Sequence, residues 1–173
     1  QLEMAVRPLP LVDDLSILPR PFVDVYDYEP EPLTFLLPPN PSDTVLQAAG
    51  VVASYFGDAG RKHGIEISAR YSNLGNENAV VFVSGANAPG GINAGSVGGS
   101  QISLLANPNN PQGSKVLIIA GGDDAGLLQA AQHLAIAARG GNLRGPSVQV
   151  NAAPALQEHA IDDASRWISL TEP

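Results

Sequence analysis

The sequence predicts an α/β fold, in which amphipathic helices cover a mixed and mostly parallel β-sheet. Two stretches, Leu33–Gly57 and Lys115–Arg139, each place an apolar run before a turn and then apolar residues at helical spacing. They align with each other without a gap. A third run, Ala79–Val83, is uniformly apolar, which is typical of a strand covered on both faces. Each repeat is therefore interpreted as strand, turn and helix, the building unit of α/β sheets.

The first repeat predicts a strand over Leu33–Leu37 followed by a helix. Asn40-Pro41 supplies an N-cap and a proline at the first helical position, and Gly57 and Gly60 end the helix. The alignment of the repeats pairs Leu46 with Leu128. We expect both of these leucines to be buried in the core.

The remaining strands are predicted at Ile65–Tyr71, Ile102–Ala106 and Val148–Val150. Residues 107–114 are all turn formers, and they connect Ile102–Ala106 to the apolar run of the second repeat. A parallel crossover needs about a dozen residues or more, so this pair should be antiparallel. The glycine-rich segment Ala86–Ser100 is predicted to be a loop rather than a helix.

Composition restricts the classes of partner. The chain has 173 residues, enough for one domain, and a formal net charge of -8, which argues against binding to nucleic acid or anionic lipid. It has no cysteine, which excludes disulfides and thiolate metal sites. The chain lacks an initiating Met, and we interpret it as a piece of a longer protein. Residues 1–31 are expected to form an extended arm from a preceding domain, 32–152 the α/β domain, and 153–173 an exit linker.

No residue pattern predicts a cofactor. Gly121-Gly122-Asp123-Asp124 opens the second helix, where backbone N–H groups could hold a phosphate, but its two carboxylates would repel one. Ala125 stands where the dinucleotide fingerprint needs glycine, so helix capping is the favoured role. In the first repeat the equivalent turn carries Pro38, Pro39 and Pro41, which lack the N–H donors that a flavin phosphate would need.

Catalytic and metal sites are not predicted either. His63, His133 and His159 are dispersed without metal-ligand spacing, and no nucleophile elbow occurs. Arg139 and Arg144 do not have the spacing of the arginine pair in a cyclic di-GMP receptor domain. These residues therefore give no support to cyclic di-GMP binding.

Three residues are candidates for contact with a partner or a neutral glycan. Asn93 and Ser96 lie in the uncharged loop Ala86–Ser100, and Trp167 is the only tryptophan. The alternatives are a solvated spacer for the loop and an anchor on a neighbouring domain for Trp167.

Four stretches of the sequence resemble the periplasmic B subunit of bacterial cellulose synthase. They are Pro21–Asp24, Leu46–Gly57 with Tyr55 where relatives usually have Trp, residues 107–131 beginning Asn-Pro-Asn-Asn-Pro, and Asp163–Trp167 with Ser165 where relatives have Pro. The resemblance covers nearly the whole chain, and the third stretch is the most specific.

The resemblance implies a flavodoxin-like three-layer sandwich with helices on both faces of the sheet. It implies carbohydrate-binding-like β domains before and after this domain in the same chain. It further implies a periplasmic location, tethered to the inner membrane by a part outside this chain, with the catalytic subunit and the emerging cellulose chain as partners.

The favoured hypothesis is a non-catalytic interaction module of a cellulose synthase complex that helps to guide the glucan. The alternative is a ligand- or nucleotide-binding receptor or enzyme domain, using the pocket at the strand C-termini where α/β sheets bind ligands.

Overall fold

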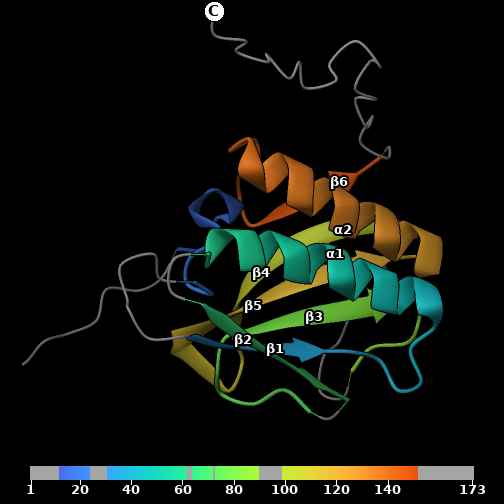
Figure 1. Cartoon of the computed structure of the whole chain (residues 1–173), viewed down its shortest axis with the longest axis horizontal. Helices are drawn as coiled ribbons and strands as arrows, with labels where there is room; N and C mark the ends of the chain where they lie inside the picture. Colours follow the sequence, from blue (N-terminus) through green and yellow to red (C-terminus); the bar gives the residue numbers. More distant parts are fainter. Residues whose placement is uncertain (1–11, 24–30, 62–63, 72, 90–98, 152–173) are drawn as a thin grey trace, which may run out of the picture.

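The computed structural model describes residues 12–23, 31–61, 64–71, 73–89 and 99–151, which form an α/β domain around one six-stranded sheet (Figure 1). The elements in chain order are the 3-10 turn η1 (Leu15–Ile17), β1 (Glu31–Leu36), α1 (Asp43–Ala59), β2 (Ile65–Arg70), β3 (Ala79–Ser84), β4 (Ser100–Asn107), β5 (Asn110–Gly121), α2 (Asp124–Arg139) and β6 (Ser147–Val150).

The sheet is mixed and mostly parallel, as predicted. Its strand order is β2-β1-β3-β5-β4-β6, and only β4 runs against its neighbours. The predicted antiparallel pairing of β4 with β5 is confirmed, with Ile102 opposite Ile119. Every residue of β3 is buried, which confirms it as a central strand.

Both described helices lie on the same face of the sheet, where they pack against each other (Figure 1). The sequence-based expectation was helices on both faces. That expectation came from the family resemblance. The right-handed rule for parallel crossovers would also favour it, because α1 leads to one edge of the sheet and α2 to the other. Opposite edges reached over one face require opposite handedness, so one of the two crossovers departs from the rule. The other face carries a smaller apolar cluster around Leu36, Val81 and Val116, closed partly by Leu74.

Helix α1 begins later and ends later than its sequence predicts. Its N-cap is Ser42, whose Oγ accepts a hydrogen bond from the Val45 N–H at 3.2 Å, so the predicted cap at Asn40 is wrong. Asn40 instead takes a left-handed turn, with φ 54°, that redirects the chain after two prolines. Gly57 lies inside the helix, and Gly60 is the C-cap.

The buried face of α1 is rotated relative to the predicted one. Its buried residues are Val45, Ala48, Val52, Tyr55 and Phe56. They align with Leu127, Ala130, Leu134, Ala137 and Ala138 of α2, of which all but the half-buried Ala138 are buried, so the equivalence of the repeats is confirmed.

The expectation that Leu46 is a core residue is wrong. It is 46% exposed, because it lies about 100° around the helix from Val45, outside the buried stripe. Its partner Leu128 is half-buried and packs on the edge of the core.

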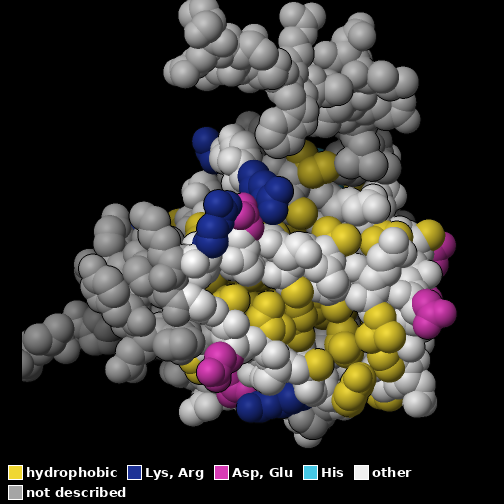
Figure 2. All heavy atoms as spheres, viewed as in Figure 1, with side chains coloured by type: hydrophobic (Ala, Val, Ile, Leu, Met, Phe, Trp, Pro, Cys, Tyr) yellow, Lys and Arg dark blue, Asp and Glu magenta, His cyan; other side chains and the backbone are white. Residues whose placement is uncertain are grey.

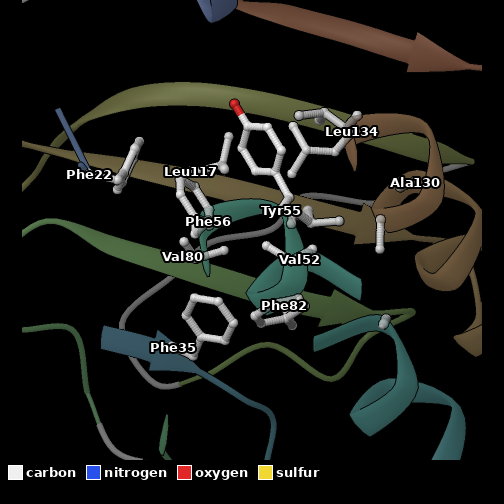
Figure 3. Packing of buried hydrophobic residues seen from close by; sticks show 14 of the residues in the cluster. Phe22, Phe35, Val52, Tyr55, Phe56, Val80, Phe82, Leu117, Ala130 and Leu134 are labelled. Carbon is white, nitrogen blue, oxygen red and sulfur yellow. The ribbon is translucent and has the colours of Figure 1, made fainter. Parts of the chain in front are cut away.

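Aromatic rings fill the space between the helices and the sheet (Figure 3). Phe35 of β1 and Phe82 of β3 have ring centroids 5.3 Å apart, and Phe56 of α1 contacts Tyr55 and Phe22. Burial raises the pKa of Tyr55 to about 12, against an opposing effect of Arg139.

The described part of the N-terminal arm, residues 12–23, packs onto the domain. Leu15, Phe22 and Val23 are buried in the main core. Asp13 accepts a hydrogen bond at 2.5 Å from the ammonium of Lys115, a β5 side chain that is almost fully buried. The predicted origin of the arm in a preceding β domain stays a prediction, as does the exit linker, which lies outside the described residues apart from its boundary.

Side chains at and beside the asparagine-rich turn between β4 and β5 donate hydrogen bonds to the loop 73–78. We call this set of contacts, made by Asn107, Asn109 and Ser114, the asparagine clasp. Asn107, which is fully buried, donates from Nδ2 to the carbonyls of Gly75 and Glu77 at 3.1 and 2.7 Å. Asn109 donates to the carbonyl of Leu74 at 2.8 Å, and Ser114 to that of Asn76 at 2.6 Å. Side-chain amides thus satisfy backbone carbonyls that no strand pairs.

The rotated helix face can be tested with two leucines. Leu127→Ala should lower the free energy of unfolding by about 2–5 kcal/mol, because Leu127 is fully buried. The matched control Leu46→Ala should change it by less than about 0.5 kcal/mol, because that side chain is half exposed. Urea titration of both variants measures the difference, and equal losses would contradict the assigned face.

The asparagine clasp can be tested separately. Asn107→Ala leaves two carbonyls of the loop 73–78 without their side-chain donor, so we expect a loss of about 1–3 kcal/mol in unfolding free energy. Gln112→Ala, at an exposed position near the start of β5, is the control. Equal unfolding midpoints for the two variants would show that the clasp contributes nothing.

Candidate functional site

The candidate ligand site of this fold is the sheet edge where β1, β3 and β5 end and both helices begin (Figure 1). Open α/β sheets bind ligands in the crevice outside the carboxyl ends of their strands. The free N–H groups of a helix N-terminus can hold an anion there. The residues at this edge therefore decide whether the domain has the usual ligand site.

A tight turn brings α2 directly against the end of β5. A Cβ atom added at Gly121 would lie 2.0 Å from the Leu127 nitrogen and 2.6 Å from the Asp123 carbonyl oxygen, so only glycine fits there. Asp123 is the N-cap, and its Oδ1 accepts from the Gly126 N–H at 2.7 Å. The predicted capping role of this motif is confirmed for Asp123.

Asp124 links three elements at this edge. Its Oδ2 accepts a hydrogen bond from the Ser42 hydroxyl at 2.5 Å, and its Oδ1 accepts one from the Ser84 hydroxyl. Ser42 caps α1, Ser84 ends β3, and Asp124 begins α2. The hydroxyl of Ser42, and then that of Ser84, lowers the pKa of Asp124 below its ordinary value.

This arrangement places an internal anion where a ligand phosphate would otherwise sit. Ser42 is the hydroxyl donor that the first turn offers, and its hydrogen bond goes to Asp124. Pro38, Pro39 and Pro41 around it have no N–H to donate. A second anion would meet the negative charge of Asp124, so the edge is unsuited to a phosphate group.

Among the residues that the structure describes, no group of three or more His, Asp or Glu side chains could hold a metal ion. His133 is half-buried in α2, whereas His63 and His159 lie outside the described residues. Within the same described ranges, no helix combines the length and the apolar character that crossing a membrane requires.

The predicted contact residues Asn93, Ser96 and Trp167 all lie outside the described residues, so their roles stay predictions. The link through Asp124 is the feature that sequence reasoning missed. Its signal was present as a second carboxylate after the cap, together with serines at Ser42 and Ser84.

The fold and this edge define an open α/β domain with a mixed sheet, in which a carboxylate of the chain itself lies at the edge where related sheets bind ligands. The family model described as "Cellulose synthase BcsB, first FD domain" matches residues 14–159 of the chain. The chain therefore belongs to this family, which confirms the resemblance seen in the sequence.

Curated relatives support the assignment. A protein named "Cyclic di-GMP-binding protein" from Pseudomonas fluorescens (strain SBW25) is 33% identical over 178 residues, covering 100% of this chain and 23% of the relative. A protein of the same name from Salmonella typhimurium is 33% identical over 99% of this chain and 22% of the relative. The chain thus spans less than a quarter of the length of these relatives. The solved chain titled "Structure of CpGH84D" has a TM-score of 0.41 and 7% identity, covering 69% of this chain and 19% of that one, and carries no argument.

The Asp124 link predicts a pH dependence of stability. Because the pKa of Asp124 is lowered in the folded state, its contribution is complete above its ordinary pKa of 3.8 and is lost as pH falls through the lower folded pKa. Asp124→Asn should therefore be less stable than the unmodified chain at pH 7, and the gap should close as the solution is acidified below pH 3.8.

Denaturant midpoints across this pH range measure the effect. Ser42→Ala and Ser84→Ala keep the carboxylate but each removes a donor, so both should shift the acid limb in the same direction as Asp124→Asn. If the denaturant midpoints of the unmodified chain and the three variants fell in the same way on acidification, the hydrogen bonds of Asp124 would contribute nothing to stability.

Proposed function

We propose that this chain is a non-catalytic structural and interaction domain of the periplasmic subunit of a cellulose synthase complex. In that role it supports cellulose synthesis and the guidance of the emerging glucan. Its partners are the catalytic subunit and the neighbouring carbohydrate-binding-like domains of its own chain. Membership of the cellulose synthase family supports the assembly.

The observation that carries the non-catalytic part of the proposal is the closed ligand edge. Asp124, Ser42 and Ser84 use their polar groups on one another, at the position where related sheets present them to a ligand. A domain whose polar side chains are satisfied internally at this edge serves as a rigid support better than as a receptor.

The relatives carry the name "Cyclic di-GMP-binding protein". For this domain we propose no such role, because the edge carries a carboxylate and three prolines where a nucleotide phosphate would need donors. The alternative function, a nucleotide- or ligand-binding receptor or enzyme domain, requires a ligand at this edge. A periplasmic location, with membrane attachment through another part of the protein, completes the proposal.

The first test addresses assembly. The full-length subunit should co-purify with the catalytic subunit, and deletion of residues 12–151 should reduce recovery of the complex and its glucan output. A matched deletion of another domain of the subunit controls for loss of chain length. Normal recovery and normal output after the deletion would overturn the interaction role.

The second test addresses the alternative. Native mass and absorbance of the purified subunit should show no stoichiometric flavin or nucleotide. In a calorimetric titration with cyclic di-GMP, the heat of binding should be the same for the unmodified subunit and for Asp124→Asn. Bound nucleotide that competes with the Asp124 edge would favour the receptor function. A reporter fusion that is active only after export checks the periplasmic location.

A further inference from the structure

Three of the exposed large hydrophobic side chains belong to α1 and to the edge strand β2 or the residue after it, and the register of β2 with β1 puts its Ile67 beside Leu33 on the helix-covered face of the sheet. They are Leu46, Ile67 and Tyr71, which are 46%, 37% and 55% exposed. Figure 2 shows hydrophobic side chains across this side of the molecule, while its charged side chains lie around the margin. We call these three residues and Ala69 the α1–β2 flank.

The α1–β2 flank is uncharged in a chain of net charge -8. Helix α1 carries no charged residue between Asp43 and Asp58. On β2, alternation sends Glu66 and Arg70 to the opposite face of the sheet, where Arg70 pairs with Glu77 at 2.9 Å. Among the residues of the flank that the structure describes, a charged partner would find no counter-charge, so this surface fits a neutral one.

Tyr71 is the one aromatic side chain of the described residues that is exposed, since the five other described rings are buried. It follows the end of β2, where the Leu37 N–H donates to the Arg70 carbonyl at 3.0 Å and holds the chain to the sheet. An aromatic ring offers a flat apolar face together with a hydroxyl that can hydrogen-bond. The apolar neighbours Ile67 and Ala69 extend that surface along the strand.

The outer edge of β2 adds hydrogen-bonding groups. Strand β2 is the last strand on its side of the sheet, so within the described residues no strand pairs with its outer N–H and C=O groups. A β-glucan matches both features, because its sugar rings have apolar C–H faces and a rim of hydroxyls, and it is neutral. A partner that offered only aliphatic side chains would leave the outer N–H and C=O groups of β2 without hydrogen bonds.

We propose that the α1–β2 flank, centred on Tyr71, is a contact site for a neutral β-glucan chain. This inference rests on the proposed function, and it names a surface through which the domain would meet the glucan.

The test titrates the full-length subunit with cellohexaose by calorimetry and takes the subunit lacking residues 12–151 as the reference, because the proposed carbohydrate-binding-like domains of the same chain can also bind the oligosaccharide. The binding that exceeds this reference is assigned to the domain. The unmodified protein should bind saturably. Tyr71→Ala should weaken binding by about 2- to 10-fold, the range expected for one lost aromatic contact, whereas Tyr71→Phe should retain it. Leu105→Ala is the matched control, because Leu105 is 44% exposed on β4, away from the flank, and binding should not change.

Binding above the deletion reference that Tyr71→Ala leaves intact would overturn the proposal, as would no binding above that reference by the unmodified protein. If Tyr71→Ala instead reduces recovery of the catalytic subunit without affecting cellohexaose, the flank is a protein interface and the glucan site is wrong. Co-purification after deletion of residues 12–151 is a separate readout, so the proposed assembly role can stand when the glucan contact fails. Thermal midpoints within the error of the control exclude misfolding as the cause.

Discussion

The packing of α1 against α2 over a single face of the sheet is the constraint on which the rest of the structure depends. Small side chains make it feasible, because Ala48 on α1 and Ala130 and Ala131 on α2 are fully buried. Helices with small residues at their contact can approach closely. Once both helices share a face, their N-termini lie side by side at one sheet edge, and Ser42 comes within hydrogen-bonding distance of Asp124. The closed ligand edge is thus a consequence of the layer arrangement.

The same constraint explains which surfaces are left open. With both helices placed over the same side, α1 makes little contact with β2, and the residues of that edge strand are exposed or half-buried. The second helical layer of a three-layer sandwich is not found among the described residues. The uncharged α1–β2 flank therefore arises where the sheet extends beyond its helical cover.

Much of the fold could be predicted from local patterns. Apolar runs located the central strands, and the length of the connection 107–114 predicted the antiparallel pair, because both signals lie within short stretches of sequence. Leu46 shows what apolar periodicity cannot predict. Where two adjacent residues such as Val45 and Leu46 are both apolar, the pattern locates the buried face only to within one position, and in the packed structure Val45 is the buried one. Asn40 shows another, since its side chain suits either a cap or a left-handed turn.

The site was less predictable than the fold because its contacts are distant in sequence. The cap at Asp123 could be predicted, since its acceptor and donor are three residues apart. Asp124 meets Ser42 and Ser84 across 82 and 40 residues, and the amides of the turn at Asn107 reach about 30 residues back to the loop 73–78. The polar types of these residues were visible in the sequence, but which of them pair follows from the strand order and not from the local sequence.

The ion pair between the buried Lys115 and the exposed Asp13 has a mechanical consequence. Strand β5 lies inside the sheet, with β3 on one side and β4 on the other, and its Lys115 ammonium holds the carboxylate of the arm. Tension applied to the chain ahead of residue 12 is therefore carried into an interior strand rather than an edge. To peel the arm away, that force would have to strip a nearly dry ammonium of its counter-ion, a step with a high energetic cost. A pull on the arm thus acts on the inside of the sheet through this ion pair.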